Sequence, residues 1–351
     1  MQCFQFPLTS AQKACQRDGE SIVVQFPLIF DGSDAVSTSH YLGSNCRARR
    51  RLLTSLHMSA QLNGTVIEPN GVGPLLRRWR EARHLSQLEL SLDAEVSARH
   101  ISFLETGRAT PSREMLLTLA NVLDVPLRER NVLLLAAGYA PVYGETSLDD
   151  PRMAQVRAVV EIMLKSNEPR SALAHDRYWN VIMANAAFVR FLTVVLGKEP
   201  AGLAPLRVST SPRVNLLHLL FDPNGLRRVI VNWEASAKAL LNEAYRRLAW
   251  ARDDTLKALI ADILSYPGVP ARWREPDLEG SQALILPMEL NLDGKIARMF
   301  STVTTVSTPH DVTLQELHVE VFYPADVETE ATLQAYEEHV KEVFGDAPPS
   351  R

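Results

Sequence analysis

Histidines beside carboxylates are the side chains of this sequence that most resemble catalytic or metal-binding groups. They occur as His175-Asp176 and His310-Asp311, with His218 between them. Such residues act as general acids, bases or metal ligands where a fixed motif brings them together. No HExxH, G-x-S-x-G, P-loop or G-x-G-x-x-G motif accompanies them. We therefore expect no enzyme activity, no metal site and no cofactor.

Side chains suited to reading DNA gather between residues 86 and 111, on two predicted short helices. Ser86 is an N-cap candidate with Glu89 as its capping-box partner, and Ser97 is the N-cap candidate of the second helix. Ile101 and Leu104 lie three residues apart, on the buried face of that helix. The apolar face of the first helix is assigned to Leu88, Leu90 and Leu92. An ordinary helical hairpin in an all-α core would have the same periodicity.

The second helix directs other side chains away from that core. Arg99 is the predicted base reader, because a guanidinium binds guanine N7 and O6 with two hydrogen bonds. Ala98 and Phe103 could pack on thymine methyl groups, and Ser102 shares their face. The sequence favours two interpretations of His100 equally: a position at the edge of the core and a contact to a phosphate.

Phosphate contacts are expected at both ends of this segment. Gln87 lies at a helix N-terminus, where its amide and the free backbone N–H groups can hold a phosphate. Thr106, Gly107 and Arg108 follow the second helix and would contact the DNA backbone again. The predicted DNA-contacting residues are Gln87, Ser97, Ala98, Arg99, His100, Ser102, Phe103, Thr106 and Arg108. One such domain covers too little DNA for useful specificity, so we expect a homodimer on a two-fold site in double-stranded DNA.

The residues on both sides of the turn follow a fixed spacing that is similar to the motif of a known family. The chain carries L-R-x-x-R-x-x-x-x-L-S-Q-x-x-L from residue 76 and V-S-x-x-x-I-S-x-L-E-x-G-R-x-x-P-S from residue 96. Both motifs resemble the XRE-type helix-turn-helix of phage repressors and Cro. The resemblance implies an ion pair between Arg80 and Glu105, which a buried Arg80 would also require. The family usually has glycine in the turn where this chain has Glu95, so backbone strain is expected there.

Helical signals around the motif predict an all-α, five-helix, repressor-like DNA-binding domain over residues 71–145. Pro74 suits the first turn of a helix, because its missing N–H costs nothing there. Further helices are predicted over residues 112–123 and 127–137, with Gly138 ending the last one. Polar residues 144–150 are typical of a linker.

Composition limits the partners and the compartment. The 351 residues carry a net charge of −4, so DNA contacts must come from a local patch rather than from a generally basic chain. Cys3, Cys15 and Cys46 all precede the recognisable domains, so no disulfide is expected there. No run of membrane-spanning length and no secretory pattern are found. We expect a cytoplasmic protein without a membrane partner.

Residues 1–70 are predicted to be a poorly structured lead. They mix polar residues with isolated apolar pieces, of which residues 21–30 would suit one strand. An arginine run at residues 47–51 could contact phosphates, although such runs are more often simply solvated. Met58 is an alternative translation start, because proteins that resemble this one usually begin close to the first helix. Residues 346–351 are predicted to be a tail.

A second domain is predicted over residues 146–345. Alternating apolar residues favour a strand around Ala172 and Ala174, a turn at residues 176–177 and a partner strand around Val181. Helices are predicted at 151–165, 225–249 and 253–264, and strands at 283–290, 295–307 and 313–323, with a hairpin turn at residues 293–294. An antiparallel sheet packed by helices suits a PAS-like sensor or a generic α+β domain. The predicted fold class of the whole chain is α+β.

Several segments of this second domain resemble the MmyB-like ligand-binding domain of bacterial regulators. They are residues 213–221, 231–234, 267–269, 300–305, 308–317 and 322–326. That family joins an XRE-type helix-turn-helix to a PAS-like domain, and the resemblance runs from about residue 72 to residue 331. It implies a small apolar ligand, with a fatty acid as the leading candidate.

Aromatic residues and one polar pair are the candidates for lining a ligand pocket. Arg213 and His218 could meet an acidic head group, although Arg213 could equally form a structural ion pair. Any one of the aromatic residues could instead be plain core. The predicted pocket residues are Trp179, Phe188, Phe191, Arg213, Leu217, His218, Phe221, Trp233 and Trp273.

The sequence therefore predicts a DNA-binding transcription regulator controlled by a small, apolar, fatty-acid-like ligand. The alternative is a DNA-bound scaffold whose second domain mediates dimerisation or protein–protein association without a ligand. An apolar cavity would favour the regulator, and a flat exposed apolar patch would favour the scaffold.

Overall fold

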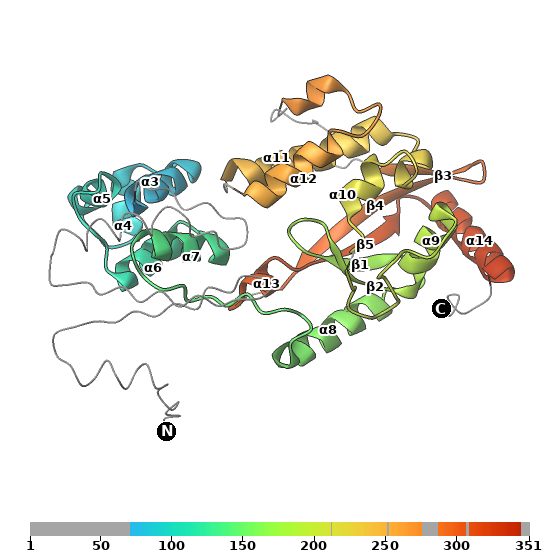
Figure 1. Ribbon diagram of the computed structural model, residues 1–351, viewed down its shortest axis with the longest axis horizontal. Helices are drawn as coiled ribbons and strands as arrows, with labels where there is room; N and C mark the ends of the chain where they lie inside the picture. The colour runs from blue at the N-terminus through green and yellow to red at the C-terminus, as the bar shows by residue number, and fades with distance from the viewer. Residues whose placement is uncertain (1–70, 212, 251–252, 276–286, 307–308, 345–351) are drawn as a thin grey trace, which may run out of the picture. The chain divides into compact units, whose positions relative to one another are not determined.

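The computed structural model describes residues 71–211, 213–250, 253–275, 287–306 and 309–344 (Figure 1). The predicted lead lies outside the described residues, together with its strand at 21–30, the arginine run, Met58 and the three cysteines. Residues 283–286 and the tail 346–351 lie outside them as well. The described chain has a group of helices followed by a domain with helices and a sheet, which confirms the predicted α+β class.

Five helices form the first domain, as predicted. They are α3 (Val72–Ala82), α4 (Gln87–Asp93), α5 (Ala98–Glu105), α6 (Arg113–Val122) and α7 (Leu127–Ala136). Serine side chains cap α4, α5 and α6, each accepting a hydrogen bond from the backbone N–H three residues on. Leu76, Leu90, Ile101 and Leu116 belong to the single core that these helices share.

The buried face of α4 differs from the prediction. Leu90 is buried, but Leu88 and Leu92 are 61% and 69% exposed. Residues two apart in a helix are turned by about 200° from each other, so Leu88 and Leu92 point outward when Leu90 points inward. Ser91 and Ala94 complete the inward face instead.

Helices α3 and α5 approach each other closely at Gly73. A Cβ atom at this position would lie 2.5 Å from the carbonyl oxygen of Leu104 and 2.6 Å from that of Glu105. Glycine is the residue that permits this approach, because it carries no Cβ. The C-terminal end of α5 therefore lies directly against the first turn of α3.

The second domain combines one sheet with several helices. Its helical elements are η1 (Pro151–Met153), α8 (Ala154–Lys165), α9 (Ala186–Leu196), α10 (Leu216–Phe221), η2 (Leu226–Arg228), α11 (Trp233–Trp250), α12 (Asp254–Ile263), η3 (Ala271–Arg274), α13 (Val312–Gln315) and α14 (Val327–Phe344). Its strands are β1 (Ala172–His175), β2 (Val181–Ala184), β3 (Met288–Leu292), β4 (Lys295–Thr305) and β5 (His318–Pro324). They form an antiparallel sheet in the order β2-β1-β5-β4-β3.

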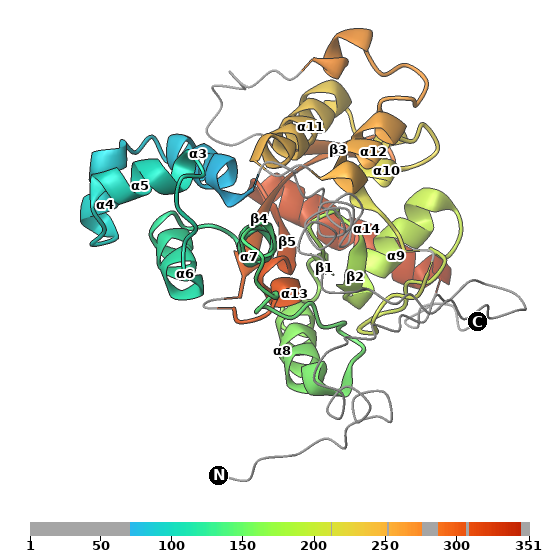
Figure 2. The same cartoon turned by 60° about the vertical axis from the view of Figure 1, so that its left-hand side comes forward.

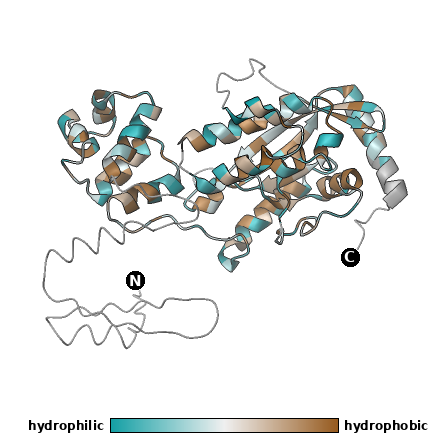
Figure 3. Ribbon diagram, turned by 45° about the horizontal axis from the view of Figure 1, so that its top comes forward, coloured by the Kyte–Doolittle hydropathy of each residue, from teal (hydrophilic) through white to brown (hydrophobic). Residues whose placement is uncertain are grey.

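Alternation along the strands gives this sheet two different faces. Ala172, Ala174, Val319 and Val321 belong to a cluster that includes side chains of α8. Leu173 points to the other face and joins the larger core with α9 to α12. Helix α8 accordingly lies on the opposite side of the sheet from α11 and α12 (Figures 1 and 2). Apolar residues follow the strands between these layers (Figure 3).

Two predicted boundaries in this domain are wrong. Helix α11 begins at Trp233 rather than at residue 225, because the preceding segment hydrogen-bonds to β3, with Val231 N–H donating to Glu289 at 2.8 Å. The strand predicted from residue 313 begins at His318. Asp311 caps the short α13 in its place, so those residues take helical geometry.

Candidate functional site

Helix α5 directs a mixed face of polar and apolar side chains away from the core. Its buried residues are Ile101, Leu104 and Glu105. Arg99 is exposed, and its guanidinium carbon lies 5.3 Å from the ring centroid of Phe103 one turn further on. Ala98 and Ser102 are half-buried beside them. The structure thus places these four predicted base-contacting residues together on the side of α5 that faces away from the core.

The other predicted contact residues lie at the two ends of α5. Ser97 caps the helix by accepting a hydrogen bond from the His100 N–H at 3.3 Å, and His100 itself is half-buried. Thr106 donates its hydroxyl to the Ser102 carbonyl at 2.7 Å, and Arg108 is exposed just beyond. These end positions flank the outward face, where phosphate contacts would fix the orientation of a reading helix.

The turn before α5 carries the strain predicted from its missing glycine. Glu95 has a φ of 54°, in the left-handed region that glycine adopts without penalty. Such a conformation costs a non-glycine residue about 1 kcal/mol or more. The surrounding backbone holds it in place, since the next N–H, that of Val96, donates to Ser91 at 3.0 Å.

A buried ion pair joins α3 to α5. Arg80 donates to the two carboxylate oxygens of Glu105 at 2.6 and 3.0 Å, and the two side chains are 10% and 3% exposed. The hydrogen bond to Glu105 raises the pKa of Arg80. Arg80 also donates to the Leu85 carbonyl at 2.7 Å. Gln87, predicted to hold a phosphate, donates its amide N–H to Glu105 at 2.8 Å and so helps to support the pair.

A cavity of about 800 Å³ lies between the sheet and helices α9, α11 and α14. Its walls are mainly apolar and include Phe188, Phe191, Leu220, Leu240, Met299 and Phe322. Val303 on β4 also lines the cavity and is 54% exposed, and Gln334 on α14 is an exposed lining residue. The cavity therefore opens to solvent.

Polar side chains gather around Trp179 in the wall of this cavity. The guanidinium carbon of Arg247 lies 4.2 Å from the Trp179 ring centroid, and its Nε donates to Glu243 at 3.2 Å. The rings of His175 and His318, which are paired across β1 and β5, have centroids 5.1 Å apart. Trp179 has a φ of 60°, a strained conformation of the kind found at functional positions.

Burial sets the protonation of the two histidines. It lowers the pKa of His175, and burial together with electrostatic repulsion from the nearby His175 and Arg247 groups lowers the pKa of His318 to about 4. His175 Nδ1 lies 2.7 Å from the Asp176 carbonyl and so carries the hydrogen. Burial also raises the pKa of Glu320, which lies 4.0 Å from His175. Both histidines are neutral at pH 7, and Arg247 is the cationic donor of this group.

The structure brings only part of the predicted pocket to the cavity. Trp179, Phe188 and Phe191 line it. The six residues that lie elsewhere are Arg213, Leu217, His218, Phe221, Trp233 and Trp273. Phe221, Trp233 and Trp273 pack on one another with ring centroids 5.5 to 6.2 Å apart and form core.

The remaining three predicted pocket residues have contacts outside this cavity. Leu217 is fully buried in the same core. His218 Nδ1 lies 3.0 Å from the Tyr266 hydroxyl. Arg213 donates to the Ser209 carbonyl at 3.4 Å.

Sequence reasoning missed the polar residues of the cavity. His318 and Glu320 alternate with buried Val319 and Val321 along β5, a pattern that usually indicates a solvent-facing side. Here that side faces the cavity because helices cover it. Arg247 belongs to a long amphipathic helix and carries no local signal that would separate it from a surface arginine.

The part of the chain that the structure describes contains neither a metal-site arrangement of side chains nor a membrane-spanning helix. Within it, no group of three or more His, Cys, Asp or Glu side chains is arranged to hold a metal ion. None of its described helices has both the length and the apolar character needed to cross a membrane.

Two short helices with serine N-caps, followed by a domain that contains a cavity, are the combination typical of ligand-binding transcription regulators. Residues 76–130 match a family model described as helix-turn-helix, and residues 156–335 match the MmyB-like transcription regulator ligand binding domain. The second match covers more than half of the chain, so the chain belongs to the MmyB-like transcription regulators. It is a DNA-binding transcription regulator with a ligand-binding domain. No curated protein matches the sequence significantly.

Proposed function

We propose that this regulator binds a two-fold DNA site as a homodimer and is controlled by an amphipathic, fatty-acid-like molecule held in its second domain. The observation that carries the proposal is the cavity of about 800 Å³. Ligand pockets commonly have about 300 to 1,000 Å³, mostly apolar walls and a few convergent polar groups. A domain that served only as a scaffold would not need such a space.

The walls favour a ligand with an apolar chain and a polar end. Phe188, Phe322 and Leu240 offer an apolar surface that can exclude water from a hydrocarbon chain. Arg247 supplies a cationic donor at the polar end, and a carboxylate would compete with Glu243 for it. The neutral His175 beside it can exchange hydrogen bonds without adding charge.

The test is native mass spectrometry of the purified full-length protein, followed by denaturing extraction of any molecule that travels with it. Leu240→Trp should fill the cavity, because Leu240 lines it from α11. Ala239→Trp is the matched control, since Ala239 is the exposed neighbour on the same helix. We expect one amphipathic molecule per chain with the parent and Ala239→Trp proteins, and none with Leu240→Trp.

If the protein is purified without a bound molecule, tetradecanoate is titrated into it and binding is measured by isothermal titration calorimetry. Binding to the parent protein and to Ala239→Trp, but not to Leu240→Trp, supports the proposal. An empty parent protein that also fails to bind tetradecanoate, yet forms a tight dimer, would refute the sensor function. The scaffold function would then be preferred.

A further inference from the structure

We infer that a chain of partly buried ion pairs, Arg177–Glu316–Arg128, transmits occupancy of the cavity to helix α7 of the DNA-binding domain. The inference rests on the proposed function, because the cavity must hold a ligand for there to be an occupancy to transmit. Its physical basis is a short turn between β1 and β2 that contacts both the cavity and the ion pairs.

That turn carries its two functional side chains only two positions apart. Trp179 lines the cavity, whereas Arg177 pairs with Glu316 on the far side of the turn. Asp176 makes the turn rigid by accepting hydrogen bonds from the backbone N–H groups of Tyr178 and Asn180 at 2.8 and 2.9 Å. A rigid turn moves as a unit, so a displacement at Trp179 is felt at Arg177.

Arg247 provides a second contact between the cavity and the turn. Its guanidinium lies over the Trp179 ring, and its Nη1 donates to the backbone carbonyl of Arg177 at 3.1 Å. A head group that drew Arg247 toward the cavity would weaken or redirect that hydrogen bond. The ligand thus has differential contacts with two arrangements of the turn, which any ligand-driven change requires.

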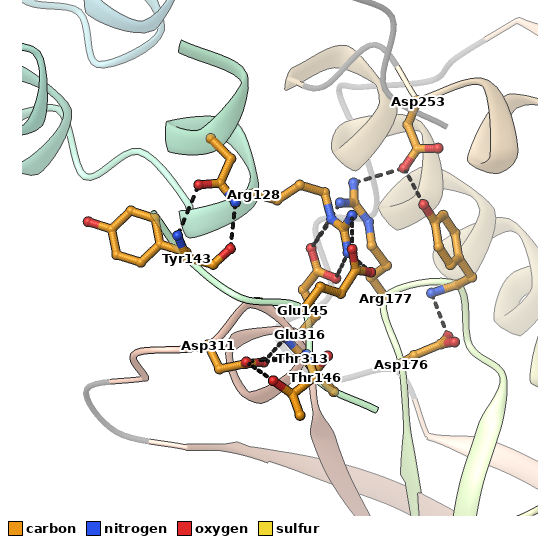
Figure 4. A network of polar contacts seen from close by, with 12 residues as sticks. Arg128, Tyr143, Glu145, Thr146, Asp176, Arg177, Asp253, Asp311, Thr313 and Glu316 are labelled. Atoms are coloured by element: carbon orange, nitrogen blue, oxygen red, sulfur yellow. Dashed lines mark hydrogen bonds and ion pairs between the residues drawn. The ribbon is translucent and has the colours of Figure 1, made fainter. Parts of the chain in front are cut away.

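Beyond the turn, acids and arginines alternate (Figure 4). Arg177 donates to Asp253 and to Glu316, both at 2.9 Å. Glu316 also accepts from Arg128 of α7 at 2.8 and 2.9 Å, and Arg128 in turn pairs with Glu145. Burial would lower the pKa of Arg128, but the bonds to Glu316 and Glu145 outweigh it and raise that pKa.

Shared partners allow this chain of pairs to switch between discrete arrangements. Glu316 accepts from two guanidiniums, and Arg177 is divided between two carboxylates. The side chains of Arg128, Arg177 and Glu316 are only 10%, 14% and 17% exposed. Solvent screens such pairs weakly, so a change of partner at one link alters the energy at the next.

The last link reaches the DNA-binding domain at the start of α7. The Leu127 N–H donates to the side chain of Gln315 at 2.6 Å, next to Glu316. The linker is held to the same place, since Val312 N–H donates to the Gly144 carbonyl at 2.8 Å. Helix α7 packs on α3, and α3 holds the reading helix α5 through the buried pair described above. A shift at α7 is therefore transferred to the helix that faces DNA.

A double-mutant cycle in the full-length protein tests the relay without any ligand. Arg128→Gln and Arg247→Gln would be measured singly and together by fluorescence anisotropy, on a duplex that the parent protein selects from a random pool. Coupled sites should give a double variant whose affinity departs roughly three- to thirtyfold from the product of the single effects. Arg246→Gln is the matched control, because Arg246 pairs with Glu243 at the surface, whereas the described hydrogen bond to the Arg177 carbonyl comes from Arg247.

The relay would be overturned if the DNA affinity of the Arg128→Gln, Arg247→Gln double variant lay within about twofold of the product of the two single effects. Such independent effects are what we expect for the control pair Arg246→Gln with Arg128→Gln. Circular dichroism and thermal denaturation establish that each variant is folded. If Arg128→Gln does not fold, Glu316→Gln takes its place in the cycle, since it keeps the side-chain shape and removes the charge.

Tetradecanoate provides the second arm of the test. The change that it causes in duplex affinity should disappear in Arg128→Gln and persist in Arg246→Gln. If tetradecanoate binds and Arg128→Gln responds as the parent does, the relay is wrong and the sensor function stands. If nothing binds to the parent protein, the sensor function fails, and the mutational cycle still decides whether the two domains are coupled through these residues.

Discussion

Replacing Arg80 with leucine should destabilise the DNA-binding domain far more than its position outside the reading helix suggests. Arg80 makes three hydrogen bonds, two to Glu105 and one to the Leu85 carbonyl. Without it, the Glu105 carboxylate, whose side chain is 3% exposed, keeps the Gln87 amide as its described hydrogen-bond partner. Removing one member of a buried pair costs about 3 to 5 kcal/mol, because the other charge is left uncompensated.

The double variant Arg80→Leu with Glu105→Leu separates this cause from simple loss of packing. Both charges are then absent, and a buried pair replaced by apolar residues of similar volume is often neutral or even stabilising. We expect the double variant to recover about 2 kcal/mol or more relative to Arg80→Leu alone. The surface control is Arg77→Leu, because the Arg77–Glu81 pair is 64% and 52% exposed and should contribute nothing measurable.

Hydrogen exchange read by mass spectrometry measures the effect in this domain alone. The protection of backbone amides in α3 and α5 should fall roughly 100- to 4,000-fold in Arg80→Leu, since each 1.4 kcal/mol is a factor of ten. Protection within tenfold of the parent would refute the reasoning. So would a double variant that is less stable than Arg80→Leu.

Three further predictions concern reading, strain and pH. Arg99→Ala should reduce the preference for one base at one position by about 1 to 3 kcal/mol, measured by selecting sites from a random DNA pool. Arg108→Ala should weaken binding to all DNA sequences evenly and reduce the slope of log affinity against log salt concentration by about one. An unchanged base preference in Arg99→Ala would show that Arg99 does not read the base. Glu95→Gly should raise the free energy of unfolding by about 0.5 to 1 kcal/mol in urea, because it relieves a positive φ at some entropic cost, and a decrease would contradict this. Because the folded-state pKa of His318 is about 4, below its ordinary 6.5, the unfolded chain takes up the proton first and stability should fall as pH drops from 6.5 to 4, by up to about 3 kcal/mol. His318→Gln should flatten this part of the pH profile of thermal stability, and an equally steep profile would count against the neutral, buried imidazole.

The DNA-binding domain could be predicted from sequence because the interactions that define it are local. Serine caps and their partners lie three residues apart, and the buried positions Ile101 and Leu104 follow the helical period. The backbone strain at Glu95 could also be predicted, because the family motif usually has glycine at this position. The error at α4 was also local, since Leu88 and Leu92 cannot share a helix face with Leu90.

The cavity depended on contacts that no local pattern records. The sequence offered several aromatic residues as pocket candidates, but whether a ring lines a cavity or fills a core depends on what lies opposite it. Trp179 lines the cavity, whereas Trp233 and Trp273 meet each other. The polar group around Trp179 comes from β1, β5 and α11, and residues as distant as His175 and His318 become neighbours only through strand pairing.

The sequence by itself therefore determined the class of the protein, the two short helices of the helix-turn-helix and the α+β character of the second domain. Hydrophobic periodicity, capping residues and motif spacing depend on residues that are close in the sequence, so they can be recognised without knowing the fold. Tertiary structure alone decided which side of β5 faces a cavity and that Arg128 meets Glu316, 188 positions away. Those contacts arise from how the elements pack, and the energy of a buried charge or an open cavity depends on every neighbour that packing brings.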